Sequence, residues 1–410
     1  MKNLVILGAG TSGTMMVNHM IHKLDKEEWK ITIVDQYKTH YYQPGFLFLP
    51  FDLYKTKDVK KKGKKYIPKK ARYVLQKIDK IIPEKNQVKL EHEYLNYDIL
   101  IIATGTKIAP EETEGMKEAN WQKNIFDFYT YEGAKSLRDK LREFKGGKLV
   151  VHITEMPIKC PVAPLEFAFL ADSYFINKGM RDKVEITYVT PLEGAFTKPK
   201  ATAALHHLLE EKGIKEVTDF DIERVDYKNN KIIDYGDREV PYDLLVTVPT
   251  NLGDEVIERS GLGDDMNFVP TNKATLQSKA NENIFVIGDA SNLPASKAGS
   301  VAHFEAEILT DNIMRYINNE PLKEEFDGHA NCFIETGHGK ALLIDFNYTH
   351  EPVAGTFPFP GIGPLKLLGE SRMNHMGKLA FRWIYWNMLI KGIHIPFVSA
   401  TMSKKGKKNG

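Results

Sequence analysis

Residues 3–13 read NLVILGAGTSG, an apolar run that leads into three glycines. Gly8, Gly10 and Gly13 have the spacing G-x-G-x-x-G, and the chain continues through TMMVNHMIHKL to a second apolar run, KITIVD, which ends in Asp35. Gly8 permits a tight turn, Gly10 lets the backbone approach a pyrophosphate, and Gly13 lets helix and strand pack closely. The segment therefore predicts a strand–helix–strand unit that binds a dinucleotide.

The ends of this unit supply the other contacts expected for the dinucleotide. The helix begins at Thr11 and Ser12, where its free N–H groups face the phosphates. Asp35 lies twenty-two residues after Gly13, a suitable place to bind ribose hydroxyls, and Gln36 follows it. We assign these four residues to the cofactor site. The alternative, a glycine turn in some other α/β fold, is disfavoured because strand, helix, strand and acid occur in order.

Length and composition exclude several classes of protein. The chain has 410 residues, enough for two or three domains, and its 56 basic against 54 acidic residues do not indicate nucleic-acid binding. We expect no signal peptide and no spanning helix, because no apolar stretch approaches about 20 residues. Two distant cysteines form no disulfide framework, which predicts a cytoplasmic chain whose thiols serve the core or chemistry. No His/Cys cluster has metal-ligand spacing, so we predict no metal.

Two later apolar runs end in motifs that indicate which dinucleotide is bound. YDILIIATGTK contains Ala103, Thr104 and Gly105, and NENIFVIGDASNLP contains Gly288 and Asp289. An N-terminal GxGxxG, a mid-chain ATG and a late GD, each at a strand end, resemble the two-dinucleotide-binding flavoproteins of glutathione-reductase-like fold. The resemblance implies FAD as the cofactor, with the late aspartate near its ribityl or phosphate region.

The same resemblance implies an α/β architecture with two tandem Rossmann-like domains. We expect a discontinuous FAD domain, residues 1–115 and 241–325, into which a second Rossmann-like domain, 116–240, is inserted. YDLLVTVPT, residues 242–250, would mark the return from the inserted domain. Residues 326–410 are expected to form a C-terminal module of different composition that associates with a membrane.

PIKCPVAPLE, residues 157–166, stands where an NADH-using relative would carry a second glycine-rich turn. No glycine occurs between Gly147 and Gly179, and three prolines crowd the turn, which argues against NAD(P)H as the reductant. Cys160 lies just ahead of a helix N-terminus and beside Lys159, and both features favour a thiolate. The alternative is a small buried apolar cysteine, the commonest fate of a free thiol.

PIKCPVAPLE, the N-terminal fingerprint and the late segment HANCFIETGHGKALLIDFNY together resemble the sulfide:quinone oxidoreductases, and the resemblance runs along the whole chain. Members of that family pass electrons from sulfide through two redox cysteines to FAD and then to a membrane quinone. The resemblance implies that Cys160 and Cys332 are this pair. Glu166 matches the family's acid/base glutamate, and Lys297 matches a lysine near the flavin and quinone. An ordinary loop lysine is an equal alternative for Lys297.

One departure from the family concerns the attachment of FAD. Many members carry a third cysteine upstream, which in several is bonded to the flavin, whereas this chain reads NIFDFYTYEGAK there, with Tyr129 near the expected place. We therefore expect FAD to be held non-covalently, and the length of the sulfur product stays open. Because Cys332 follows the GD strand, in the module that closes over the flavin, we expect it to face the flavin and Cys160 to carry the persulfide.

The C-terminal segment ESRMNHMGKLAFRWIYWNMLIKGIHIPF mixes aromatic and basic residues, which is typical of a helix that lies in a bilayer surface. The basic tail SKKGKKNG can attract anionic head groups. The alternatives are a core or dimer helix and a merely solvated tail. We place Phe357, Phe359 and Ile362 nearest the quinone ring, because aromatic and aliphatic walls suit a quinone slot. We expect a peripheral homo-oligomer on the cytoplasmic face of the cell membrane.

Two other functions compete with sulfide:quinone oxidoreduction. One is an NADH:quinone reductase of the same fold, which the missing second fingerprint disfavours. The other is a flavin-bearing redox sensor without turnover, which two thiols at the family positions disfavour.

Overall fold

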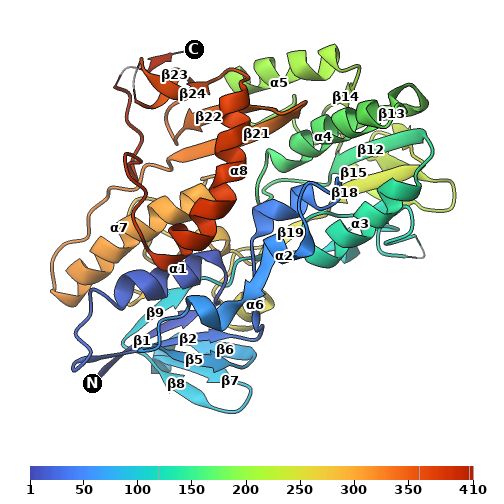
Figure 1. Ribbon diagram of the computed structural model, residues 1–410. Helices are drawn as coiled ribbons and strands as arrows, with labels where there is room; N and C mark the ends of the chain where they lie inside the picture. The colour runs from blue at the N-terminus through green and yellow to red at the C-terminus, as the bar shows by residue number, and fades with distance from the viewer. Residues whose placement is uncertain (119, 360, 406, 410) are drawn as a thin grey trace.

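The GxGxxG strand is the centre of a parallel sheet in the computed structural model, which describes residues 1–118, 120–359, 361–405 and 407–409. In spatial order its strands are β20 (Ile284–Val286), β9 (Ile99–Ile102), β1 (Lys2–Leu7), β2 (Trp29–Asp35) and β5 (Arg72–Leu75). Two helices, α1 (Thr11–Met20) and α7 (Gly299–Ile317), pack side by side next to this sheet (Figure 1). The predicted Rossmann-like α/β fold is confirmed.

The central strand reads as a continuous apolar run because the sheet is buried on both faces. Leu4 and Ile6 join the core that α1 and α7 cover, whereas Val5 and Leu7 join a separate core on the other face. That second core is completed by an antiparallel sheet and a short helix: β6 (Ile78–Ile82), β7 (Gln87–Leu90), β8 (Tyr94–Asn96) and α6 (Glu255–Arg259).

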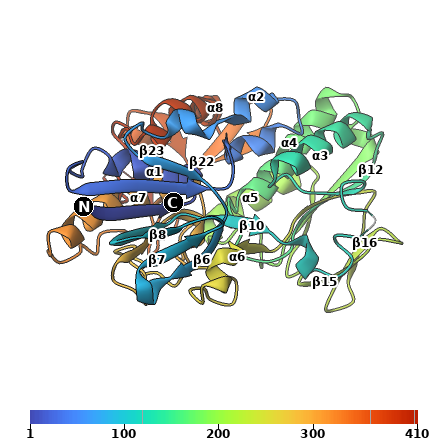
Figure 2. The same cartoon turned by 90° about the horizontal axis from the view of Figure 1, so that it is seen from below.

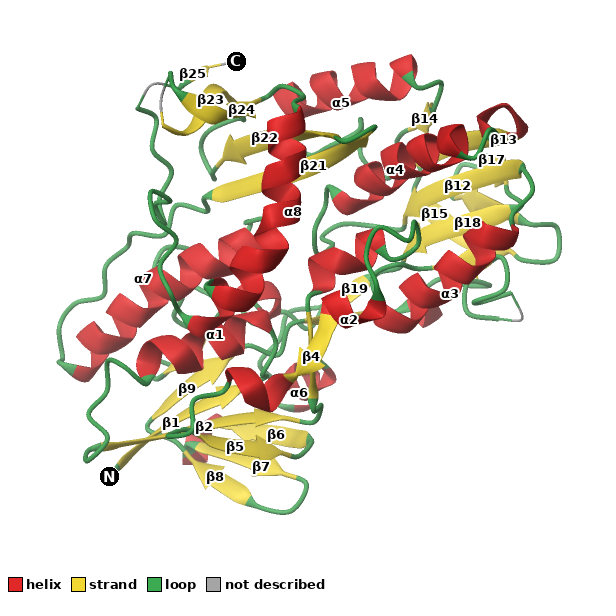
Figure 3. Cartoon of the chain, viewed as in Figure 1, coloured by secondary structure: helices red, strands yellow, loops and turns green. Residues whose placement is uncertain are grey.

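A second five-stranded parallel sheet carries the proline-rich turn (Figure 3). Its strands, in spatial order, are β11 (Ile125–Phe126), β18 (Leu244–Val248), β12 (Gly147–Ile153), β13 (Val184–Val189) and β14 (Lys215–Val217). Its helices are α3 (Tyr131–Glu143), α4 (Ala163–Asn177) and α5 (Pro199–Glu211). A three-stranded sheet, β15 (Ile222–Asp226), β16 (Lys231–Asp234) and β17 (Glu239–Pro241), lies beyond β14 in sequence. The turn after β12 leads into α4.

The return from the inserted domain comes later than the sequence suggested. β18 pairs in parallel with β12 over its whole length, so YDLLVTVPT belongs to the second sheet and the boundary at 240 is one strand too early. The chain crosses back through an antiparallel ribbon, β10 (Thr106–Ile108) and β19 (Asn251–Gly253). The error arose because an apolar run ending in a turn looks the same in either sheet.

The C-terminal residues form a third sheet, crossed by one long helix (Figure 1). The strands, in spatial order, are β21 (Ala330–Gly337), β22 (Lys340–Phe346), β24 (Gly363–Leu367), β23 (Val353–Phe359) and β25 (Lys408–Asn409). The helix α8 (Arg372–Asn387) packs on β21, β22 and β24, and the turn after it, η7 (Leu389–Lys391), packs on α1. Among the described residues, no helix is long and apolar enough to cross a membrane.

Candidate active site

The loop between β1 and α1 fits a dinucleotide. A Cβ on Gly8 would overlap the carbonyl of Ala103, and one on Gly13 would overlap the carbonyl of Gly8, so these turns lie in direct backbone contact. A Cβ on Gly10 would meet no atom within 4 Å, and no side chain caps the first turn of α1. The N–H groups of that turn are therefore left for a phosphate, as the sequence predicted.

The predicted ribose acid closes the same loop from the end of β2. The Asp35 carboxylate accepts the N–H groups of Ala9 and Tyr37, at 2.6 and 2.7 Å, which orients it beside the glycine turn. Gln36 is exposed next to it. The Thr104 hydroxyl is buried and has no partner among the described residues, so it is available to a bound group. These features are those that FAD requires.

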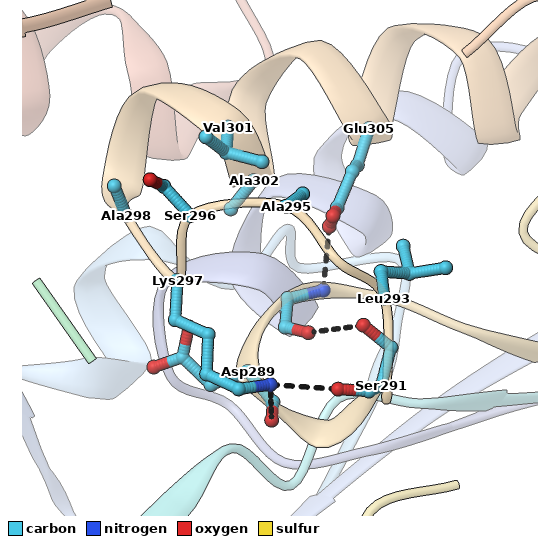
Figure 4. A pocket seen from close by; sticks show the side chains of 11 residues that line it. Asp289, Ser291, Leu293, Ala295, Ser296, Lys297, Ala298, Val301, Ala302 and Glu305 are labelled. Atoms are coloured by element: carbon cyan, nitrogen blue, oxygen red, sulfur yellow. Dashed lines mark hydrogen bonds between the residues drawn. The ribbon is translucent and has the colours of Figure 1, made fainter. Parts of the chain in front are cut away.

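The GD motif faces this loop from β20. A Cβ on Gly288 would overlap the Ser12 hydroxyl, so the two predicted cofactor segments are in contact. Figure 4 shows the pocket after the motif, where the Lys297 ammonium donates to the carbonyls of Asp289 and Ser291, at 2.9 and 2.6 Å. Lys297 therefore holds the loop closed from within, a role that loop position alone did not indicate.

Glu305 of α7 is a buried acid in this pocket that sequence reasoning missed. Its carboxylate accepts the Gly288 N–H at 2.6 Å (Figure 4), and burial raises its pKa to about 7. A carboxyl that is half protonated near neutral pH can give or take a proton beside the cofactor loop. The only sequence signal was its place six residues after the helix start, which many surface residues share.

The proline-rich turn is tied directly to the GD loop. The Cys160 N–H donates to the Lys297 carbonyl at 2.7 Å, and the Tyr129 hydroxyl donates to the Cys160 carbonyl at 3.0 Å. Cys160 has φ 50°, in the left-handed region that only a fixed turn maintains in a non-glycine residue. The structure therefore brings the first cysteine to Lys297, whose ammonium binds the Asp289 carbonyl, although the two loops are far apart in the sequence.

Helix α4 brings the second cysteine to the same place by packing on β21. Glu166, which is completely buried, accepts the Glu335 N–H at 2.7 Å, three residues along β21 from Cys332. Both cysteines are free thiols that pack against one core, and a charge on Cys332 would raise the pKa of Cys160 further. Cys160, Cys332 and Glu166 thus lie close enough to act on one another's charge, and their catalytic roles stay a prediction.

Lys378 of α8 is the second residue that sequence reasoning missed. Its ammonium donates to the Glu166 carboxylate and, at 3.0 Å, to the Phe333 carbonyl. Burial lowers the pKa of Lys378, but the charges of Glu166, Cys160 and Glu335 outweigh burial and raise it above its ordinary value. A buried lysine that stays charged between two thiols and two carboxylates is a functional candidate.

The expected activation of Cys160 by its own turn is wrong. Burial raises the pKa of both thiols to about 12, and the Glu166 charge adds to the rise, whereas the Lys378 charge lowers it. Desolvation outweighs the helix N-terminus and Lys159 because a thiolate in an apolar site loses its hydration. Lys378, the cation that lowers the pKa of both thiols, lies on the C-terminal helix α8.

Residues 2–306 match the sequence profile of the pyridine nucleotide-disulphide oxidoreductases, three-quarters of the chain. The chain belongs to this family. As a member, it is an FAD-binding oxidoreductase, and the predicted cofactor is confirmed. A sulfide:quinone oxidoreductase of Dictyostelium discoideum is 28% identical over 95% of this chain and 86% of its own. A type II NADH:quinone oxidoreductase of Staphylococcus aureus is 24% identical over 86% of this chain and 91% of its own.

A solved structure extends the likeness to the fold. The sulfide:quinone oxidoreductase of the bacterium Aquifex aeolicus superposes with a TM-score of 0.78, at 22% identity, over 96% of this chain and 92% of its own. The predicted two-domain flavoprotein architecture is confirmed, and so is the resemblance to the sulfide:quinone oxidoreductases. In the present chain, the proline-rich turn with Cys160 stands after β12, where an NADH-using relative would carry a second glycine-rich fingerprint.

The C-terminal helix α8 of the present chain is only partly a surface helix. Tyr385 and Trp386, expected to face lipid, are buried: the Tyr385 hydroxyl lies 2.8 Å from the Thr11 hydroxyl and 2.7 Å from His40 Nε2. The helix therefore contacts Thr11 of the phosphate loop through Tyr385 and, through Lys378, Glu166 of the cysteine site. Periodicity could not reveal this, because both faces of α8 carry aromatic residues.

The three residues predicted to line the quinone site lie on the β23–β24 hairpin. Phe357 packs against the small core of the third sheet, Phe359 packs on Phe397 with ring centroids 5.0 Å apart, and Ile362 is 85% exposed at the turn. An exposed tip is not a closed slot for a ring, so contact with quinone at these residues stays a prediction.

Proposed function

We propose that this chain is a sulfide:quinone oxidoreductase that uses Cys160 and Cys332 as its redox pair. The observation that carries the proposal is that the Cys160 N–H is bonded to the Lys297 carbonyl, while Glu166 and Lys378 act on the pKa of both cysteines. Relatives named as sulfide:quinone oxidoreductases align along 95% of the chain. The match to type II NADH:quinone oxidoreductases gives the competing function, an NADH oxidoreductase.

The cysteines perform the sulfur chemistry. Hydrosulfide attacks the Cys160–Cys332 disulfide, the S–S bond breaks, and the products are a persulfide on one cysteine and a thiolate on the other. The persulfide and the thiolate then join as a trisulfide, with the added sulfur between the two cysteines, which releases one proton and two electrons. FAD would be held by the glycine loop, the Asp289 loop and Lys297, and it would supply the two-electron acceptor between the cysteines and quinone. The Lys378 ammonium stabilises the thiolate, and Glu166 is close enough to take the proton.

The reductant distinguishes the two candidate functions. Anaerobic sulfide is expected to bleach the flavin within seconds, and a soluble quinone should restore it, whereas NADH and NADPH should leave the spectrum unchanged. The reason is that the turn after β12 is tied to Lys297 and offers no glycine cradle to a second pyrophosphate. The measurement is stopped-flow absorbance of the flavin band. Rapid bleaching by NADH with none by sulfide would establish the competing function instead.

The attachment of FAD gives a separate prediction. Acid or hot denaturant should release all of the flavin into the soluble fraction, because Tyr129 stands at the place of the third cysteine and its hydroxyl is bonded to the Cys160 carbonyl. The measurement is flavin absorbance of the precipitated chain and of the supernatant. Flavin that remains with the precipitated polypeptide would contradict non-covalent binding.

We further propose that the partner quinone lies in a membrane to which the chain binds peripherally. An exposed apolar face on α8, described below, supports this. The cytoplasmic side of that membrane and the homo-oligomer stay predictions.

A further inference from the structure

Residues 55–70, here called the lysine segment, carry nine lysines and a single acid. The segment includes α2 (Thr56–Val59) and β4 (Lys60–Lys62), which pairs with β3 (Thr39–Tyr41). Eight of the lysines are exposed and Lys61 is half-buried. The one acid, Asp58, pairs with Arg382 of α8 at 3.1 Å, so nothing within the segment neutralises its lysines. The nearly balanced total charge of the chain does not reveal this concentration.

The lysine segment and α8 form one surface. The Trp386 indole donates to the Asp58 carbonyl at 3.1 Å, and the Lys61 ammonium lies 4.4 Å from the centre of the Trp386 ring. Burial lowers the pKa of Lys61, and the charges of Lys65, Arg382 and Lys391 lower it further, which shows how closely cations from both elements gather. Both views place α2 beside α8, and Figure 2 shows the two along one edge of the molecule.

The outer face of α8 next to these cations is apolar. Met373, Met376, Leu379 and Trp383 recur at helical spacing and face solvent, with Met376 59% and Trp383 62% exposed. The inner face carries Lys378 to the cysteines. A solvent-facing apolar stripe beside a dense group of cations is the pattern of a helix that lies in a lipid interface.

We infer that the lysine segment and the outer face of α8 together bind an anionic phospholipid bilayer, with the lysines selecting the charge of the lipid. The inference rests on the membrane partner in the proposed function and names its surface and its lipid class. Eight exposed lysines spread along one edge match a plane of negative charge, not the shape of one folded partner. The basic tail contributes less, because the Lys407 ammonium is held by the buried Asp345 carboxylate.

The test is co-sedimentation of the full chain, with FAD, on phosphatidylcholine vesicles with or without phosphatidylglycerol, at low and high salt. The test variant is Lys57→Gln/Lys62→Gln/Lys64→Gln, whose three side chains are exposed. Each charge near an anionic surface is worth about fivefold in binding, so the triple variant should bind phosphatidylglycerol vesicles on the order of 100-fold more weakly. Raised salt should weaken the wild type in the same direction.

The matched control changes three exposed lysines on other elements, Lys183→Gln/Lys228→Gln/Lys279→Gln, and should bind like the wild type. Trp383→Gln should weaken binding to both kinds of vesicle. The inference is overturned if the wild type does not bind vesicles, if it binds both lipids equally, or if the two triple variants lose the same affinity. Sulfide bleaching in solution should be equal in all variants; its absence in the wild type would defeat the proposed function and leave the vesicle result intact.

Discussion

Cys160→Ser is expected to leave the flavin oxidised under excess sulfide, with a fall in the bleaching rate of more than about 10³-fold. The Cys160 amide is bonded to the Lys297 carbonyl, and the Lys297 ammonium to the Asp289 carbonyl, so this cysteine is fixed to the loop that the family uses for its flavin. Without its thiol, electrons from the persulfide have no route to the cofactor. Serine is nearly isosteric, so the turn should keep its shape.

Cys332→Ser should also abolish turnover, but with a different time course. Cys332 lies on β21, where burial raises its pKa and the side chains of Lys378, Glu166, Ser300 and Asp345 also act on it. Among the described residues, its segment is bonded to Ser300 at the start of α7, whereas the Cys160 segment is bonded to Lys297, whose ammonium binds the Asp289 carbonyl. A lone Cys160 thiolate and hydrosulfide can form one persulfide only if oxidised FAD takes the two electrons, and no second thiol is left to remove that persulfide, so at most one slow, partial bleaching is expected. This reverses the sequence-based assignment, in which Cys332 faced the flavin because it follows the GD strand.

Stopped-flow absorbance of both variants under anaerobic sulfide is the measurement. Dithionite must still bleach each variant, which shows that the flavin is bound and reducible. A full single bleaching in Cys160→Ser with none in Cys332→Ser would restore the original assignment. Wild-type turnover in either variant would remove the disulfide mechanism altogether.

The sequence predicted those parts of the site that depend on local backbone chemistry. The spacing of Gly8, Gly10 and Gly13 indicated the phosphate loop because only glycine satisfies the close approaches of Gly8 and Gly13 to neighbouring carbonyls. The prolines around Cys160 indicated that no second nucleotide turn is present, because a pyrophosphate cannot approach a turn that has no glycine. Short-range steric limits depend on a few adjacent residues, so they can be predicted without knowledge of the fold.

The parts that the sequence could not supply depend on long-range packing. Lys378 is 212 residues from Glu166, and its helix has the composition of a surface helix, so no local pattern indicated that it would enter the cysteine site. The wrong direction of the Cys160 pKa has the same origin. A helix N-terminus and a neighbouring lysine are visible in sequence, whereas the loss of water around the thiol appears only when α4, β21 and α8 pack together.

Lys378→Met is expected to slow flavin bleaching by on the order of 10²-fold or more at neutral pH and to move the rising limb of its pH profile to higher pH. The Lys378 charge lowers the pKa of both thiols, against burial, which raises each to about 12. Removing the charge raises those pKa values, so less thiolate is present at a given pH and a higher pH is needed to restore it. Each pKa unit costs tenfold in thiolate.

Glu166→Gln should move the same limb in the opposite direction. The Glu166 charge raises the pKa of both thiols, so its removal lets them ionise at lower pH. If Glu166 also takes the proton in turnover, the maximum rate falls by about 10²–10⁴-fold even though the limb moves down. A rate that falls without any movement of the limb would contradict the electrostatic role, and movement without a fall would contradict the acid/base role.

The pair also has to be tested for folding, because Glu166 is completely buried. Removing Lys378 alone leaves a buried carboxylate without its cation, which typically costs about 3–5 kcal/mol of stability, whereas the double variant Lys378→Met/Glu166→Gln should recover most of that loss. Arg372→Met, on the exposed side of α8, is the control and should change neither stability nor bleaching. A double variant that is stable yet bleaches like the wild type would show that the ion pair serves folding and leaves the thiols unaffected.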